Sequence, residues 1–441
     1  MVSIGMVGSS ISGVSFVSVP GMVGKIDFSY MQTVLGFFVG YLIIANVLLP
    51  LYYRMNLTSI YSYLESRFGK YSYKTGAAFF LLSRTIGSGI RLFLVTLILQ
   101  HLIFDQWHIP FVLTATVAVF LIWLYTHRSG IKTIVWTDTL QTICLISALV
   151  LMVAQVAKTL NFGTEGFLST IFSYKHSRIF VFDDWHSKQN FFKQFFSGIF
   201  IAIAMTGLDQ DMMQKNLTCR NLRDAQKNMY WYGIAFVPLN LIFLTLGAMM
   251  LLLASQNNIA LPVNSDDILP LFATQYLGHT VTFLFVIGII AATFASSDSA
   301  LASLTTSFSV DILGVKHDEP KIAERKRKFT HIGMSVLFVG IMLIFKALNN
   351  KSIIDAVYTI VSYTYGPLLG MFAFGLFSKR QIRDKLMPVI AVISPILCFG
   401  LNQLSLTLFN YYFGYELLII NGLITFTGMI ISSSRQIMVD I

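Results

Sequence analysis

The chain has 441 residues, of which 55% are hydrophobic and only 12% are charged, and its mean hydropathy is +0.69. About a quarter of the residues are charged in a typical soluble domain, so this composition excludes an ordinary soluble protein. The net charge of +10 does not indicate nucleic-acid binding, because most basic residues lie in alternate loops and at helix ends. The sequence therefore predicts a single all-α transmembrane domain over residues 1–441.

Apolar segments of about 20 residues recur along the chain, and this is the length needed to cross the hydrocarbon core of a bilayer. They predict about twelve transmembrane helices, with bounds good to a few residues. The expected helices cover residues 1–24, 30–52, 76–104, 110–127, 131–157, 190–208, 229–255, 280–310, 329–346, 353–377, 386–411 and 415–432.

Lysine and arginine gather in the loops on one side of the predicted membrane. Because basic loops favour the cytoplasmic side, we expect both termini in the cytoplasm and the protein in a bacterial inner membrane, in contact with lipid. The external segment 158–189 is expected to form a partly ordered cap. The basic loops are 53–75, the loop near residue 128, 209–228, 311–328 and 378–385.

The first predicted helix is rich in glycine and serine, with Gly8-Ser-Ser-Ile-Ser-Gly13 at its middle. A membrane helix that is broken at mid-bilayer has this composition. Unwinding would free main-chain carbonyls, which suit a small hard cation such as sodium. The alternative is a face of small residues for close helix packing. The residues alone leave both interpretations open.

Two carboxylates are expected deep inside predicted helices, Asp138 in 131–157 and Asp298 near the middle of 280–310. Ser296, Ser299 and Ser303 recur at spacings of three and four and so share a face near Asp298. Acidic residues at membrane depth are costly and indicate an ion or proton site. For Asp138, pairing with an arginine is the alternative.

Arg84 and Arg91 are seven residues apart in the third predicted helix and project on nearly the same face. Arg84 is expected close enough to the cytoplasmic end for its side chain to reach the interface. Arg91 lies near the middle and must pair with an acid or face a polar cavity. Two hypotheses compete, a structural ion pair with Asp138 or Asp298 and a clamp for the carboxylate of a substrate.

Four motifs, in this order along the chain, resemble those of the sodium:solute symporter family. The first contains Leu-Glu-Ser-Arg-Phe, the second Trp-Thr-Asp, the third Asp-Gln-Asp-Met-Met-Gln-Lys followed by Asp-Ala-Gln, and the fourth ends in Val-Asp-Ile. They occupy residues 56–69, 130–141, 209–226 and 296–312.

The resemblance implies a LeuT-type fold with two inverted five-helix repeats, residues 1–157 and 190–377, and two extra helices in 386–432. It implies sodium-coupled uptake of a small polar organic solute by alternating access, with a carboxylate favoured by Arg91. Na+ would be the coupling ion, and a monomer would be sufficient for transport. A proton-coupled or uncoupled carrier on the same fold and a non-transporting solute sensor are the alternatives.

Enzymatic activity is not expected, because the eight histidines show no catalytic or metal-ligand arrangement. The three cysteines have neither disulfide nor zinc spacing, so no metal other than sodium is expected. Most relatives have a helix before the broken one, whereas this chain begins inside or just before it. The start is misassigned, the chain is a fragment, or a subgroup dispenses with that helix.

By position, the resemblance implies a sodium site made of main-chain carbonyls and one hydroxyl. Its ligands would be the carbonyls of Gly8, Ile11 and Ala292 and the hydroxyl of Ser296. Many relatives have two adjacent hydroxyl residues here, whereas this chain has Ala295 before Ser296.

The resemblance also implies a second cation site and a set of substrate contacts. In carboxylate-transporting relatives an arginine of the third helix holds the acid group, and Arg91 matches that position. The second cation site would be formed by Asp138, Asp298 and Ser299. The substrate contacts would be Ser10, Ser15, Phe16, Arg91 and Asp209.

Overall fold

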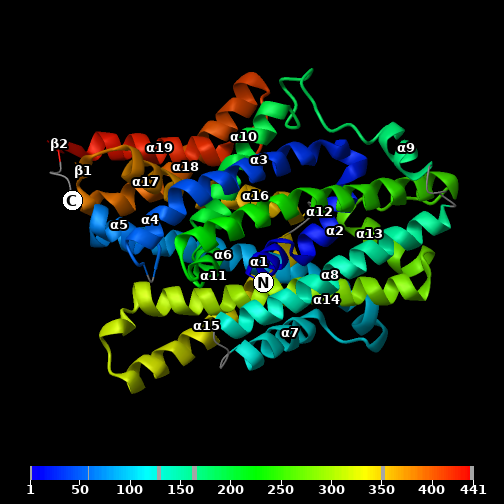
Figure 1. Cartoon of the computed structure of the whole chain (residues 1–441), viewed down its shortest axis with the longest axis horizontal. Coiled ribbons are helices and arrows are strands. Elements are labelled where there is room, and N and C mark those ends of the chain that lie inside the picture. The colour runs from blue at the N-terminus through cyan, green and yellow to red at the C-terminus, as the bar shows by residue number, and fades with distance from the viewer. Residues whose placement is uncertain (1, 58, 127–130, 161–165, 349–352, 438–441) are drawn as a thin grey trace.

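A computed structural model describes residues 2–57, 59–126, 131–160, 166–348 and 353–437, which are almost entirely helical (Figure 1). The helices up to residue 173 are α1 (Val2–Ser10), α2 (Gly13–Ile26), α3 (Tyr30–Ile43), α4 (Leu49–Arg54), α5 (Ser62–Arg67), α6 (Lys70–Leu99), α7 (Phe111–Thr126), α8 (Ile131–Thr159) and α9 (Gly166–Ser173). Those that follow are α10 (Phe191–Ala202), α11 (Gln210–Leu217), α12 (Leu222–Gln256), α13 (Ile268–Leu271), α14 (Gly278–Ser307), α15 (Pro320–Leu348), α16 (Ile353–Thr364), α17 (Gly366–Phe377), α18 (Met387–Phe409) and α19 (Leu417–Ser432).

Each of the expected transmembrane segments contains helix in the structure, which confirms the all-α membrane fold. Among the described residues, seven helices are long and apolar enough to cross a membrane, or up to nine if each of two bent pairs forms one span. The first of these stretches, Gly13–Arg54, includes the second half of the expected helix 1–24 and all of the expected helix 30–52. The number twelve therefore stays a prediction.

The first helix is broken in its glycine- and serine-rich segment, which is one of the two interpretations that the sequence leaves open. α1 ends at Ser10 and α2 begins at Gly13, with Ser12 in an extended conformation (φ −75°, ψ 171°) between them. In Figure 1, α1 and α2 lie near the centre of the bundle. α1 packs against α8, α11, α12 and α14, and α2 packs against α6, α12, α14 and α16. The break is therefore surrounded by helices from both halves of the chain.

A second broken span lies in the later half of the chain. Phe191–Gly207 and Gln210–Leu217 are bent by 66° at a short break. The Asp209 side chain caps α11, because its Oδ1 accepts hydrogen bonds from the main-chain N–H groups of Asp211 (3.0 Å) and Met212 (3.2 Å).

This second break corrects one sequence prediction. Residues 209–228 were expected to form a basic cytoplasmic loop, but Gln210–Leu217 is helix α11 and the Lys215 side chain is only 2% exposed. A lysine in a polar stretch after an apolar helix is typical of a loop. Here Asp209 caps the start of a new helix, α11, and the Lys215 side chain on that helix points into the bundle.

Apolar side chains cover the outer surface of several helices. Only 17% of the most apolar window of Asp384–Phe409 is buried, compared with 67% for Leu222–Gln256. Exposed residues on α18 include Val389, Val392 and Ile396. One small antiparallel sheet joins β1 (Arg380–Ile382) to β2 (Ser433–Ile437) beside the last helix. The interior around α1, α2, α6, α8, α11 and α14 is the part that gathers polar residues.

Candidate functional site

A cavity of about 70 Å³ opens beside the break between α1 and α2. Both halves of the break contribute to its wall, together with α3, α6, α12 and α16. Its wall contains hydroxyl groups, aromatic rings and two arginines. The polar residues of the wall are Ser10, Ser12, Ser15, Tyr41, Arg84, Arg91, Thr206, Tyr232 and Tyr358. The cavity therefore carries two arginines and several hydroxyl groups among apolar side chains, and it lies where the main chain is unwound.

The two arginines in this wall differ in their partners. Arg84 is buried, and its Nη2 lies 2.6 Å from Asp211 Oδ2 while its Nη1 lies 3.5 Å from Asp209 Oδ2. The expectation that Arg84 reaches the membrane interface is therefore wrong. Arg91 makes no hydrogen bond or ion pair with any residue that the structure describes. Its guanidinium has five N–H donors available to a ligand in the cavity.

Three of the five predicted substrate contacts line this cavity, Ser10, Ser15 and Arg91. Ser10 Oγ accepts a hydrogen bond of 2.6 Å from Tyr232 Oη on α12, which fixes the end of α1. The other two are corrected below.

Phe16 and Asp209 lie outside the cavity wall, contrary to the sequence prediction. Phe16 is completely buried among the rings of Phe243 and Phe285, at centroid distances of 5.7 and 6.1 Å. It faces the hydrophobic interior because it lies on the opposite side of α2 from the cavity. Asp209 is also fully buried, and it accepts a hydrogen bond of 2.9 Å from Tyr365 Oη besides capping α11.

The four predicted sodium ligands lie on the two elements that meet at the break. Gly8 and Ile11 belong to the α1–α2 segment, and Ala292 and Ser296 belong to α14. Neither the carbonyl of Gly8 nor that of Ile11 accepts a main-chain hydrogen bond among the described residues. A Cβ on Gly13 would lie 2.8 Å from Thr293 Oγ1, so the break closely approaches the turn of α14 that holds Ala292 and Ser296. Ser296 is buried, and its hydroxyl donates to the Thr293 carbonyl at 3.1 Å. The Ala295 side chain lies outside the described part of the structure.

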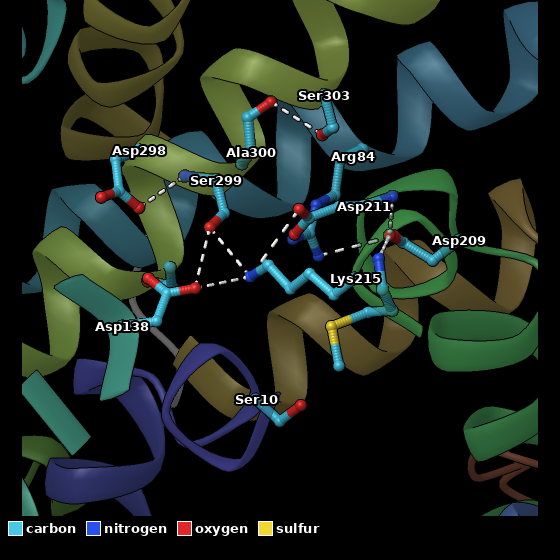
Figure 2. A network of polar contacts seen from close by, with 12 residues as sticks. Ser10, Arg84, Asp138, Asp209, Asp211, Lys215, Asp298, Ser299, Ala300 and Ser303 are labelled. Carbon is cyan, nitrogen blue, oxygen red and sulfur yellow. Dashed lines mark hydrogen bonds and ion pairs between the residues drawn. The ribbon is translucent and has the colours of Figure 1, made fainter. Parts of the chain in front are cut away.

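The predicted second cation site contains a side chain that the sequence did not associate with it (Figure 2). Lys215 Nζ lies 2.8 Å from Asp138 Oδ2 and donates a hydrogen bond of 2.8 Å to Ser299 Oγ. Ser299 Oγ in turn donates to Asp138 Oδ2 at 3.2 Å. The same ammonium is 3.8 Å from Asp211 Oδ1. Asp138 therefore pairs with a lysine, and neither arginine is its partner.

Asp298 completes the predicted trio but makes a different contact. It is fully buried, and its Oδ1 accepts from the main-chain N–H of Ser299 at 2.5 Å. In Figure 2 its carboxylate lies beyond Ser299, on the side away from Lys215. The structure thus brings Asp138 and Ser299 into direct contact with one another, and Asp298 is the residue before Ser299 in α14.

Comparison with known proteins identifies the chain at the level of the family. The family described as "Sodium:solute symporter family" matches residues 1–384. The chain belongs to the sodium:solute symporter family.

Curated relatives within this family cover nearly the whole chain. The sodium/sialic acid symporter NanT of Aliivibrio fischeri is 25% identical over 95% of this chain and 83% of its own length. The sodium/sialic acid symporter SiaT of Proteus mirabilis is 24% identical over 98% of this chain and 87% of its own length. The sodium-coupled monocarboxylate transporter 1 of Mus musculus is 25% identical over 85% of this chain and 62% of its own length.

Solved structures show that this symporter has the LeuT-type fold. A sodium-coupled sialic acid symporter, solved in a substrate-bound outward-open state, aligns with a TM-score of 0.81 at 19% identity, covering 99% of this chain and 90% of that one. The nucleobase-cation-symport-1 transporter Mhp1 in a closed conformation aligns with a TM-score of 0.63 at 12% identity, covering 98% and 91%.

The sequence missed several polar residues of this symporter's interior. Tyr41, Tyr232 and Tyr358 line the cavity, and nothing in their local sequence separates them from interfacial or packing tyrosines. Lys215 carries a signal that could have found it, because it follows Asp211 by one helical turn within a motif of the family. Residues 127–130, which include the predicted basic loop near residue 128 and the first residue of the second motif, lie outside the described residues.

Proposed function

We propose that this symporter couples sodium influx to the uptake of a small organic acid by alternating access. The observation that carries the proposal is the polar cavity at the break of the first helix, whose wall includes Arg91 without a partner among the described residues. Transporters built from inverted repeats bind solute and ions at such breaks, near the middle of the membrane.

We assign the coupling sodium to the carbonyls of Gly8, Ile11 and Ala292 and the hydroxyl of Ser296. Hard cations prefer oxygen ligands, and the break supplies two carbonyls that accept no main-chain hydrogen bond among the described residues. The close approach of Gly13 to α14 supports this assignment, because it brings both sets of ligands to the same contact.

We assign the acid group of the solute to Arg91, with Ser10 and Ser15 as neighbouring hydroxyl ligands. A guanidinium binds a carboxylate through two parallel hydrogen bonds, and Arg84 is less available because Asp209 and Asp211 already offset its charge. The cavity of about 70 Å³ is small beside the 300–1,000 Å³ typical of sites for drug-sized ligands. A short-chain carboxylate therefore suits this conformation better than a bulky sugar acid.

We further propose that residues 1–157 and 190–377 are the two inverted repeats, each opening with a broken helix. The breaks after Ser10 and before Gln210 support this division. Helices 386–432 would lie outside the repeats against lipid. Both termini would face the cytoplasm of a bacterial inner membrane, and one monomer would be sufficient for transport.

A proton-coupled or uncoupled carrier is the second candidate. Ala295 favours it, since one hydroxyl that many relatives have beside Ser296 is missing. The two buried carboxylates favour it less than the sequence suggested, because Asp138 already pairs with Lys215.

Uptake into proteoliposomes tests the proposal. Labelled short-chain carboxylates should accumulate when sodium is higher outside, and replacing external sodium by choline at fixed pH should abolish accumulation. Equal uptake in both salts would overturn sodium coupling. A thermal-shift series of carboxylates and matched uncharged alcohols in sodium selects the solute to label, because a ligand that binds the native state raises its melting temperature.

A further inference from the structure

The Lys215 ammonium lies among oxygen atoms that would otherwise suit a cation. It joins three helices, because Lys215 lies on α11, Asp138 on α8 and Ser299 on α14 (Figure 2). All three side chains are nearly inaccessible, with Lys215 2% exposed and Asp138 0%. One carboxylate oxygen and one hydroxyl oxygen each lie 2.8 Å from the nitrogen.

The oxygens around this ammonium belong to the chemical types that a sodium ion uses. Lysine and sodium carry the same single positive charge, and a buried carboxylate needs one such charge to offset it. A sodium ion that contacted both Asp138 Oδ2 and Ser299 Oγ would have to lie almost against the ammonium. Two like charges at that separation, away from bulk water, repel strongly.

We propose that Lys215 is a tethered cation that occupies the second cation site of this symporter. The chain then binds sodium only at the first site, between the α1–α2 break and α14, and no ion is exchanged at Asp138. This inference rests on the proposed function only for the identity of the first site. Because the ammonium stays attached to α11, the second site carries no ion across the membrane in the transport cycle.

The decisive measurement is the number of sodium ions bound per chain, from saturation binding of 22Na+ to the purified full-length protein in detergent. Lys215→Met removes the charge and keeps the length of the side chain, leaving Asp138 and Ser299 to a free cation. It should bind one more sodium ion per chain than the wild type. Adding Asp138→Asn to Lys215→Met should remove that extra ion, whereas Lys215→Arg should bind no extra ion.

Lys193→Met is the matched control, because Lys193 is also a buried lysine but lies on α10 over the Tyr411 ring. It should leave the number of bound sodium ions unchanged. Asp138→Asn in the wild-type background gives an independent measurement that does not require the Lys215 variants to fold. It should also leave the number unchanged, because the wild-type partner of Asp138 is the lysine.

An unchanged number in well-folded Lys215→Met, or the loss of one ion in Asp138→Asn alone, would overturn the tethered-cation proposal. The numbers of sodium ions bound to the wild type and to Lys215→Met together distinguish failure of this proposal from failure of the proposed function. A wild type that binds no sodium, with one ion in Lys215→Met, would refute sodium coupling and support the tethered cation. If the wild type and the Lys215→Met variant each bind one ion, sodium coupling is supported and the tethered cation is refuted.

Discussion

Arg84 Nη2 on α6 lies 2.6 Å from Asp211 Oδ2 on α11, and both side chains are almost completely buried. The contact joins a helix of the first half of the chain to the short helix after the second break, 127 residues further on. It also separates the roles of two arginines that share a helix face. The charge of Arg84 is offset within the protein, whereas Arg91, two turns along, is available to a solute.

Arg91→Gln should weaken solute binding without unfolding the protein. Hydrogen bonds to a charged group contribute about 1.5–3 kcal/mol, so the KM for a carboxylate solute should rise about 10- to 100-fold. The melting temperature should stay within a few degrees of the wild type, since no described residue loses a partner. Uptake kinetics and thermal unfolding of one preparation measure both, and an unchanged KM would exclude Arg91 as the carboxylate ligand.

Arg84→Met should act in the opposite way and destabilise the fold. Removing one member of a buried ion pair leaves an uncompensated charge, and the loss is about 3–5 kcal/mol. Thermal unfolding in detergent should show a large fall in melting temperature. Lys328→Met is the control, because its pair with Glu324 is exposed and contributes little to stability. Equal melting temperatures for the two variants would refute the structural role of Arg84.

Ser296→Ala should raise the sodium concentration that gives half-maximal uptake by about tenfold, which corresponds to about 1.4 kcal/mol for one lost ligand. Ser297→Ala is a close control, since Ser297 is equally buried on the same helix and is not among the proposed ligands. Sodium titration of uptake should separate the two variants. If both shift equally, the effect belongs to the packing of α14 and the ligand assignment fails.

Gly8→Ala should destabilise the contact between α1 and α8. The added Cβ would lie 1.8 Å from Thr142 Oγ1, a hydroxyl that already donates to the Asp138 carbonyl at 2.5 Å. Overpacking of this kind costs about 1–3 kcal/mol. Gly87→Ala on α6 should be neutral or slightly stabilising, because its Cβ would meet nothing within 4 Å.

Thermal unfolding of Gly8→Ala, Gly87→Ala and the double variant Gly8→Ala/Thr142→Ala checks this prediction. The double variant should recover part of the lost stability, because it removes the nearest atom. A Gly8→Ala protein as stable as the wild type would mean that α1 moves freely away from α8.

Local sequence predicted the helices well, and it offered the break in the first helix as one of two interpretations. Apolar length predicts a transmembrane helix because each backbone group must be satisfied within the segment, whatever its neighbours are. Glycine and serine at residues 8–13 are compatible with the break because both have lower helix propensity than alanine or leucine, but they also suit a face for close helix packing. The second break was missed because its apolar helix ends normally, and only the Asp209 cap, seen in three dimensions, restarts the chain as α11.

The polar interior was predicted in part. Ser10, Ser15 and Arg91 line the cavity as expected, since each lies at or opposite the break. Phe16 and Asp209 do not, because the direction in which a side chain points depends on how its helix is rotated in the bundle.

The sequence by itself determined that this protein is a helical membrane protein of the sodium:solute symporter family. These properties depend on composition and on residues close together in the chain. Only the tertiary structure decided which buried charges meet. Lys215 and Asp138 are 77 residues apart, and their contact depends on the bend before α11 and on the packing of α8 against α14. A buried charge requires a partner, but helix packing selects which one it obtains.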